Sequence, residues 1–193
     1  MNKQLVLASS SPFRRELLEK LGLKFSCDSP DIDETAQTNE TPQQLVARLA
    51  QEKAKVVAAR HPDALIIASD QCAVLDGNIL GKPGNHQAAV QQLQAASGKK
   101  VQFLTSLALL NAKTGNLQID VCPFAVYFRT LTYSEIESYL NKEKPYNCAG
   151  SFKSEGLGIT LFQRLEGDDP NTLIGLPLIR LTAMLGKEGV SLY

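Results

Sequence analysis

Short apolar runs alternate along the chain with segments whose apolar residues recur at helical spacing. We expect strands over residues 4–8, 63–70, 101–110 and 117–129, a hairpin over 74–80, and helices over 12–21, 41–60, 86–97, 132–141 and 171–185, the last interrupted near Pro177. Residues 26–40 are acidic and rich in turn formers, which favours a surface loop. Strands and helices joined by short connections indicate an α/β fold with a mixed central sheet flanked by helices.

Capping signals mark where the predicted helices begin. Ser11 suits the N-cap of the first helix, and Pro12 suits its first position, where no hydrogen bond is lost. Thr41 and Gln44 form a capping box ahead of the second helix, and Thr132 opens a later helix in the same way. The second helix is the clearest element in the sequence.

Composition restricts the classes of function. Lys and Arg number 20, and Asp and Glu also number 20, so the chain lacks the basic excess that general nucleic-acid binding needs. The four cysteines lie far apart without a C-x-x-C pair, which argues against zinc and favours reduced thiols in the cytoplasm. No apolar stretch approaches the roughly 18 residues of a membrane span. We therefore expect a cytoplasmic protein that binds neither nucleic acid nor membrane.

Arg14 and Arg15 lie in the first turn of the first predicted helix, where positive charge opposes the helix dipole. A bound phosphate would resolve the conflict, because free backbone N–H groups and two guanidinium groups would converge on it. The alternative is that both side chains point into water. The local pattern makes both arginines candidate substrate-binding residues.

Three further charged residues are candidates by position. Lys53 continues the apolar face of the second helix, although a lysine there is often at the rim of the core. Asp70 closes a predicted buried strand, where ligands bind in open α/β sheets, although a turn or cap aspartate is also common. Lys82 lies in a Gly-Lys-Pro turn, which is not a Walker A loop, because proline replaces the Ser or Thr that would bind Mg²⁺.

Several segments resemble, in order, the signature blocks of the Maf nucleotide pyrophosphatases. They are Leu7–Leu18, Asp31–Glu34, Leu49–Ala54, Ser69–Gln71, Leu80–Pro83, Ala149–Gly156 and Asn171–Pro177. The resemblance covers nearly the whole chain, so we expect a single Maf-like domain over residues 1–193. It implies a fold related to inosine triphosphate pyrophosphatases, with two lobes around a cleft, and a homodimer. It also implies hydrolysis of the α–β phosphoanhydride of a nucleoside triphosphate, which yields a nucleoside monophosphate and diphosphate.

The same resemblance implies roles for residues of this chain. The triphosphate would be bound by Ser9, Arg14, Lys53 and Lys82. Asp70 would act as the general base on the attacking water, and Glu34 and Asp70 would hold the metal. Lys53 and Lys82 would also be catalytic, because pre-placed cations stabilise the leaving diphosphate. The cofactor would be Mg²⁺, with Mn²⁺ or Co²⁺ as alternatives, since all accept oxygen-rich sites.

The nucleotide base is indicated by Phe13, Gln71 and Glu155. Many family members carry Arg, Thr and Gln at these positions and resemble enzymes that act on dTTP, UTP and related pyrimidine nucleotides. The combination in this chain resembles the branch that hydrolyses 7-methyl-GTP. Methylation at N7 gives guanine a positive charge, which an aromatic face attracts and a carboxylate neutralises. Two alternatives stay open: action on other non-standard or pyrimidine nucleotides, and a place for Phe13 in the core beside Leu17 and Leu21.

Two other classes of function compete with catalysis. A non-catalytic nucleotide-binding regulator of cell division would use the same cationic residues, but the intact Glu34, Asp70 and Lys82 argue against a degenerate site. An RNA-binding module that reads modified ends is disfavoured by the zero net charge and by an aromatic content of only 6%.

Overall fold

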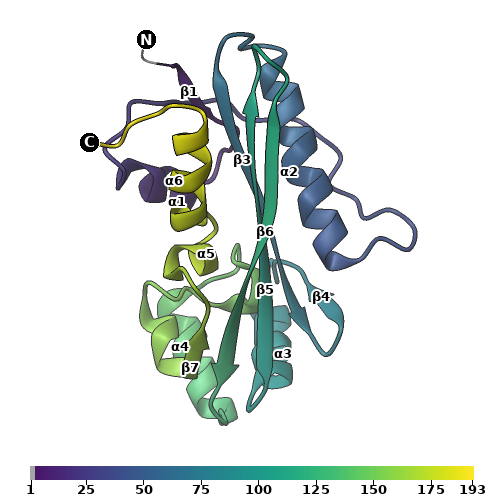
Figure 1. Cartoon of the computed structure of the whole chain (residues 1–193). Coiled ribbons are helices and arrows are strands. Elements are labelled where there is room, and N and C mark those ends of the chain that lie inside the picture. The colour runs from purple at the N-terminus through teal and green to yellow at the C-terminus, as the bar shows by residue number, and fades with distance from the viewer. Residues whose placement is uncertain (1–2) are drawn as a thin grey trace. The chain divides into compact units, whose positions relative to one another are not determined.

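The protein contains a seven-stranded mixed sheet and several helices in this computed structural model, which describes residues 3–193. The strands are β1 (Leu5–Leu7), β2 (Ser26–Cys27), β3 (Leu65–Leu75), β4 (Asn78–Leu80), β5 (Lys100–Asn111), β6 (Leu117–Phe128) and β7 (Phe162–Glu166). Their order is β2-β1-β3-β5-β6-β7, with β4 paired to β3 (Figure 1). β1 is parallel to β2 and β3, whereas β4 and β7 are antiparallel to their partners, so the expected mixed sheet is confirmed.

The chain divides into two units. The first unit comprises three segments: the residues up to Gln71, Thr105–Cys122 and Asp169–Tyr193. The second unit comprises Cys72–Leu104 and Pro123–Asp168. The helices are α1 (Pro12–Glu19), α2 (Pro42–Ala58), α3 (His86–Ala96), α4 (Tyr133–Glu143), α5 (Pro170–Ile174) and α6 (Leu178–Lys187), with 3₁₀ turns η1 (Ala149–Ser151) and η2 (Leu157–Leu161). No helix in the described part of the chain is long and apolar enough to cross a membrane.

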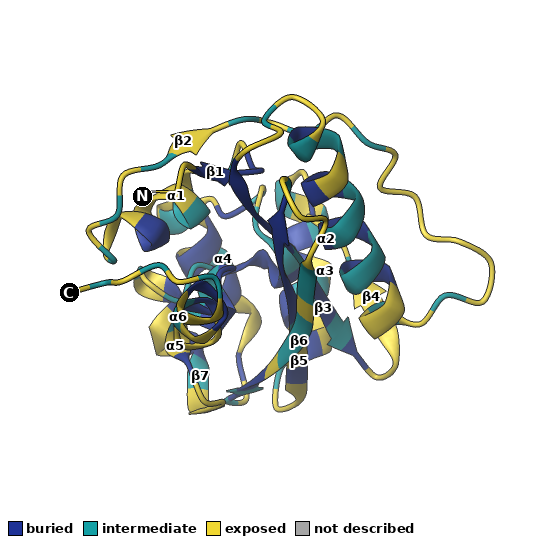
Figure 2. Ribbon diagram, turned by 45° about the horizontal axis from the view of Figure 1, so that its top comes forward, coloured by how far each residue is buried: buried dark blue, intermediate teal, exposed yellow. Residues whose placement is uncertain are grey.

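Side chains that alternate between the two faces of the central strands build the core of the first unit. Leu5 and Leu7 of β1 point to one face, where they pack with residues of α1 and α6. Val6 and the following Ala8 point to the other face and pack with residues of α2. Both faces are covered, which explains why these strands are continuous apolar runs. Figure 2 shows β1 as buried and the neighbouring β2 as exposed.

Aromatic side chains form the core of the second unit. Phe152 lies edge-to-face against Phe103, Phe128 and Phe162, with ring centroids 5.4, 5.6 and 4.8 Å apart. Gly150, at φ 75°, turns the chain so that this ring points inward. A β-carbon at position 150 would lie 3.2 Å from the Phe152 ring, so both the backbone and the space require glycine.

The predicted helix starts and the hairpin are confirmed. Ser11, Thr41 and Thr132 cap α1, α2 and α4, and the last two form complete capping boxes. Asp76 and Gly77 join β3 to β4 with φ values of 50° and 82°, as a two-residue Asp-Gly hairpin turn requires.

One predicted strand end is wrong, and two strands were not predicted. β3 does not end at Asp70 but continues to Leu75, because the buried Cys72 and Ala73 extend the apolar pattern. The acidic segment over 26–40 begins with β2, a strand with exposed side chains. β7 lies where no strand is predicted, and its side chains are mostly exposed, so it has no alternating pattern to detect.

Candidate active site

Lys53, Glu34 and Asp70 form an ionic centre in the first unit. The Nζ atom of Lys53 lies 2.6 Å from Glu34 Oε1 and 2.6 Å from Asp70 Oδ1. The side chain of Lys53 is 8% exposed and that of Asp70 is 14% exposed, whereas that of Glu34 is 62% exposed. The buried ammonium group of Lys53 therefore bridges the largely buried carboxylate of Asp70 and the exposed carboxylate of Glu34.

The elements that carry Lys53 and Asp70 are both anchored in the core. Lys53 lies on the buried face of α2 with Ala54 and Val57, so it is not at the rim of the core. The backbone of Asp70 is held by Ser106 of β5. The Ser106 Oγ accepts from the Asp70 N–H at 3.0 Å and donates to the Asp70 carbonyl at 3.2 Å. The carboxylate thus projects from a backbone that is fixed on both sides of the residue.

Arg14 is a second cation close to these acids. Its Nε donates to the carbonyl oxygen of Gly175 at 2.9 Å, and the buried Ser69 hydroxyl donates to the same oxygen at 2.9 Å. Burial lowers the pKa of Arg14, while the negative charges of Asp70 and Glu34 act in the opposite direction. Arginine stays protonated in proteins, so the first unit brings together two cations and two carboxylates.

Ser9 and Phe13, also expected at the site, lie on either side of the start of α1. Ser9 is buried, and its Oγ accepts from the Ser11 backbone N–H at 3.1 Å. Phe13 is half-buried and is not a member of the hydrophobic cluster that contains Leu17.

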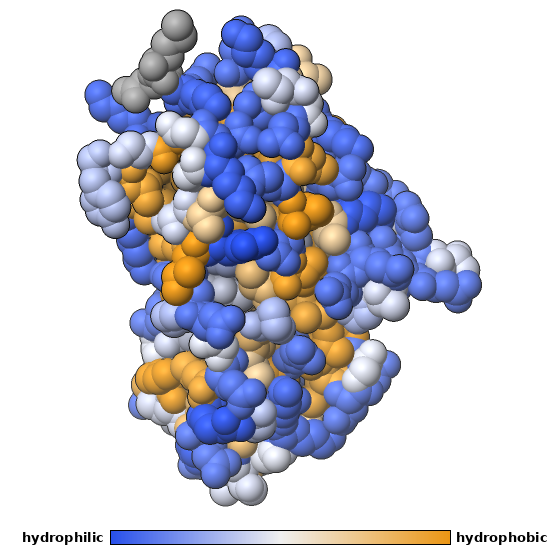
Figure 3. Space-filling view, viewed as in Figure 1, coloured by the Kyte–Doolittle hydropathy of each residue, from blue (hydrophilic) through white to orange (hydrophobic). Residues whose placement is uncertain are grey.

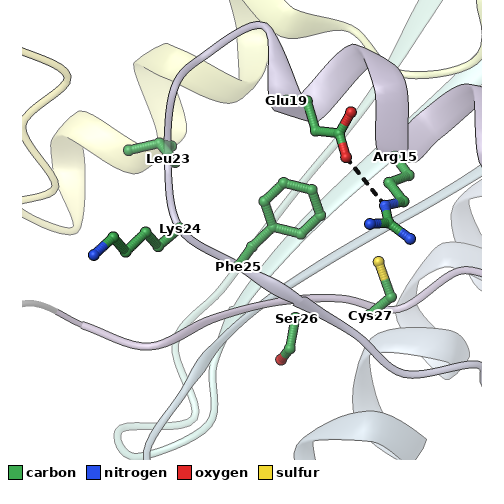
Figure 4. A pocket seen from close by; sticks show the side chains of 7 residues that line it. All are labelled: Arg15, Glu19, Leu23, Lys24, Phe25, Ser26 and Cys27. Carbon is green, nitrogen blue, oxygen red and sulfur yellow. Dashed lines mark hydrogen bonds and ion pairs between the residues drawn. The ribbon is translucent and has the colours of Figure 1, made fainter.

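Arg15 has a different environment from Arg14. Its Nε pairs with Glu19 Oε1 at 3.1 Å, and both side chains are more than half exposed. Figure 4 shows this pair at a surface pocket that Phe25 and Cys27 also line. The two guanidinium groups have separate protein partners, the Gly175 carbonyl for Arg14 and the Glu19 carboxylate for Arg15.

Gln71 is oriented by its amide nitrogen, whose two N–H groups face three acceptor oxygens. Its Nε2 lies 2.8 Å from Thr105 Oγ1, 2.9 Å from the Thr172 carbonyl and 3.1 Å from the Leu173 carbonyl. The Thr105 hydroxyl donates to the Thr172 carbonyl, so all three partners of Gln71 are acceptors and the nitrogen must face them. Oε1 takes no part in these bonds and is the atom through which Gln71 can accept from a ligand.

Lys82 and Glu155, the remaining expected residues, belong to the second unit and are exposed. Burial raises the pKa of the Cys148 thiol, while the charges of Lys153 and Lys82 lower it and that of Glu155 raises it. Their shared influence on one thiol places Lys82, Lys153 and Glu155 in one neighbourhood of this unit.

The loop that carries Lys82 is tied down at both ends. Gln92 of α3 donates from Nε2 to the Gly81 carbonyl at 3.0 Å, and its Oε1 accepts from the buried Ser151 hydroxyl at 2.6 Å. The Gly84 N–H donates to a backbone carbonyl of the turn after α4 at 2.9 Å. Gln92 therefore links this loop to the segment that leads to Glu155.

The carboxylates of the first unit suit a hard divalent cation. Glu34 and Asp70 present oxygen atoms to a single ammonium group, and oxygen is the ligand type that Mg²⁺ prefers. Over residues 3–193, no group of three or more His, Cys, Asp and Glu residues is arranged to hold a metal ion. A cation held by Glu34 and Asp70 would complete its shell with water and substrate oxygens, as Mg²⁺ commonly does.

Residues that support the site were missed by the sequence analysis. Ser106 is 36 residues from Asp70, and no spacing rule connects them. Arg48 binds Glu40 across the start of α2, and the charges alone could have suggested this pair. The contact of Ser106 with Asp70 depends on how distant segments pack, which a local pattern does not contain.

Solved structures with the same architecture define the class of fold. The Ham1 protein of Staphylococcus aureus matches with a TM-score of 0.52 at 15% identity, over 96% of this chain and 100% of that chain. A HAM1 protein from Coxiella burnetii matches with a TM-score of 0.50 at 16% identity, again over 96% and 100%. At these identities the likeness shows the fold, which is a Ham1-like mixed α/β fold.

Sequence comparison identifies the family within this class. The model of the Maf-like protein family matches residues 4–188, and the chain belongs to this family. A protein of Alcanivorax borkumensis named 7-methyl-GTP pyrophosphatase is 61% identical over 188 residues, which cover 97% of this chain and 95% of that protein. A protein of the same name from Pseudomonas syringae pv. tomato is 60% identical over 187 residues, or 97% of each chain. The family expected from the ordered blocks is therefore confirmed.

Proposed function

We propose that this chain hydrolyses 7-methyl-GTP to 7-methyl-GMP and diphosphate by cleaving the α–β phosphoanhydride. The observation that carries the proposal is the buried Lys53–Asp70 pair, in a chain that is 60–61% identical to relatives named for this reaction. The family match over residues 4–188 supports a single catalytic domain over residues 1–193.

Asp70 is the proposed general base. Its carboxylate takes a proton from a water molecule while the water oxygen bonds to the α-phosphorus. The bond from that phosphorus to the oxygen shared with the β-phosphate breaks, and diphosphate leaves with the electron pair. The ammonium of Lys53 and the guanidinium of Arg14, both close to Asp70, balance the charge that develops on the phosphate oxygens.

Glu34 and Asp70 are the proposed ligands of Mg²⁺, or of Mn²⁺ or Co²⁺ in its place, which when bound neutralises charge on the phosphate oxygens. Further contacts to the phosphates are proposed for Ser9, Arg15 and Lys82. Lys82 is held on a loop whose backbone is fixed at Gly81 and Gly84, which suits a side chain that must meet a phosphate in one place.

Phe13, Gln71 and Glu155 are the proposed determinants of base selection. The half-buried ring of Phe13 would attract the cationic methylated base, an interaction of about 0.5–2 kcal/mol. Gln71, whose Nε2 is engaged by the protein, would accept through Oε1 from the guanine edge. The exposed carboxylate of Glu155 would neutralise the positive charge of the base.

A panel of four nucleotides tests the proposal. The purified protein with Mg²⁺ should release diphosphate from 7-methyl-GTP faster than from GTP, dTTP or UTP. Equal rates on all four would disprove the base selection and keep the reaction type. Tight binding without release of diphosphate from any nucleotide would instead favour a non-catalytic regulator.

A further inference from the structure

The acidic segment from Cys27 to α2 is attached at three places to α2 and to the turn that follows it. From the end of the helix towards its start, the pairs are Asp28 with Arg60, Glu34 with Lys53, and Glu40 with Arg48. The segment therefore runs back alongside the helix that follows it, as Figure 1 and Figure 2 show. Figure 3 shows a mainly hydrophilic surface on the side of the molecule where Figure 1 draws α2 and this segment.

Arg48 makes the largest set of these contacts. Its Nε lies 2.6 Å from Glu40 Oε1 and its Nη2 lies 2.9 Å from Glu40 Oε2, a two-pronged pair. Nη2 also donates to the Thr35 carbonyl at 3.0 Å, and Nη1 to Glu52 Oε2 at 3.1 Å. The side chain of Arg48 is 18% exposed and that of Glu40 is 8% exposed, so water competes weakly for this pair.

Thr35 directly follows Glu34, so Arg48 and Lys53 bind consecutive residues of the segment. The two cations are five residues apart on α2, which corresponds to about 7.5 Å along a helix axis. Glu34 is largely exposed, and an ion pair of this kind holds a loop only weakly in water. Arg48 holds the same part of the segment through several bonds, the shielded pair with Glu40 and the exposed bond to the Thr35 carbonyl, and is therefore the stronger attachment.

We propose that Arg48 is a positioning residue that keeps Glu34 within reach of Lys53 and Asp70 when a nucleotide binds. Phosphate groups that draw the Lys53 ammonium towards themselves weaken its contact with Glu34. The bonds from Arg48 to Glu40 and to the Thr35 carbonyl do not involve Lys53, so they persist during that exchange. The inference rests on the proposed function for the reaction, but the position of the segment can be measured without any turnover.

Hydrogen exchange in the metal-free protein tests the placement directly. The Thr35 N–H bonds to Asp33 Oδ1 at 2.9 Å, and the Gln37 N–H bonds to Glu40 Oε2 at 2.9 Å. In Arg48→Ala both amides should exchange about ten-fold faster or more, because the segment opens locally, while the amides of α2 keep their rates. Lys55→Ala, which removes an exposed cation from the same helix, should change neither. If both amides of the Arg48→Ala protein exchange at the wild-type rates, the proposal is overturned.

Kinetics separates positioning from a purely structural role. Arg48→Ala should lower kcat about ten- to a hundred-fold with little change in KM, and Arg48→Lys, which cannot pair in two places, should fall between. In a chain that already carries Glu34→Ala, the Arg48 change should cause no further loss of kcat, because the side chain to be positioned is gone. If the losses of kcat from Arg48→Ala and Glu34→Ala add in the double variant and accompany a drop in Tm, the proposal is overturned. If the wild-type protein hydrolyses no nucleotide, the proposed function fails, and the exchange measurement still decides the role of Arg48.

Discussion

Lys53 Nζ and Asp70 Oδ1 lie 2.6 Å apart, on a helix and a strand that belong to the same unit. Each charge has the other as its partner in a place that is largely shielded from water, which a buried acid or ammonium needs. The contact joins the proposed base to a proposed phosphate ligand, so a change at either residue acts on both.

Asp70→Asn should lower kcat by about 10²- to 10⁴-fold, because an amide cannot take a proton from water. The amide oxygen can still accept a hydrogen bond from Lys53, so the fold and nucleotide binding should be largely kept. Diphosphate release and calorimetric titration with nucleotide measure the two effects. A fully active Asp70→Asn protein would remove this residue as the base.

Phe13→Trp should raise the preference for 7-methyl-GTP over GTP by about three- to ten-fold, because the indole face attracts cations more strongly than phenyl. Phe13→Arg should reverse the preference, since like charges repel. The ratio of kcat/KM for the two nucleotides is the measurement, with Tm recorded for each variant. A change in Tm with an unaltered ratio would place Phe13 in the core instead.

Gln92→Ala should raise KM for the nucleotide about five- to ten-fold, because each lost hydrogen bond is worth about 1 kcal/mol and the loop that bears Lys82 is released. Gln91→Ala is the matched control, since Gln91 is exposed on the same helix. Steady-state kinetics of both variants decides the matter. Equal KM values for the two would contradict a role for Gln92 in holding the loop.

Hydrogen bonds from Arg48 lower the pKa of Glu40 from 4.5 to about 2. A carboxylate with a lower pKa in the folded state stabilises the fold above its unfolded pKa, and this contribution is lost as the pH falls towards the folded value. Glu40→Gln should therefore lose less unfolding free energy than the wild type between pH 4.5 and about 2. Urea unfolding at stepped pH measures this difference, and identical losses in the two proteins would refute it.

Elements governed by local rules were predicted from the sequence. The capping box of Thr41 and Gln44 lies within one helical turn, and the Asp76–Gly77 hairpin turn needs two residues. β2 could not be predicted in this way, because Ser26 pairs with Val6 of β1. A strand with exposed side chains exists here because a distant edge has free backbone groups to pair.

The residues of the candidate site also fall into those that local sequence rules place and those that only distant packing places. Helical periodicity placed Lys53 on the buried face of α2, and that placement is confirmed. Arg15 pairs with Glu19 four residues along the helix, a contact that the spacing could have indicated, and its place beside Arg14 on a phosphate stays a prediction. Ser106 could not be foreseen, because it meets Asp70 only through the pairing of strands.

The carbonyl of Gly175 holds Arg14 in place without any ligand. Gly175 has φ 129°, a backbone conformation that residues with a side chain rarely adopt, so a larger residue would strain the turn that presents this carbonyl. A long side chain loses up to about 2 kcal/mol of rotamer entropy when it is ordered. Arg14 loses much of that freedom when the protein folds, so an anion that meets the guanidinium is bound with a smaller entropic penalty. The segment between α5 and α6 can thus strengthen anion binding by preorganising Arg14, although it does not touch the anion itself.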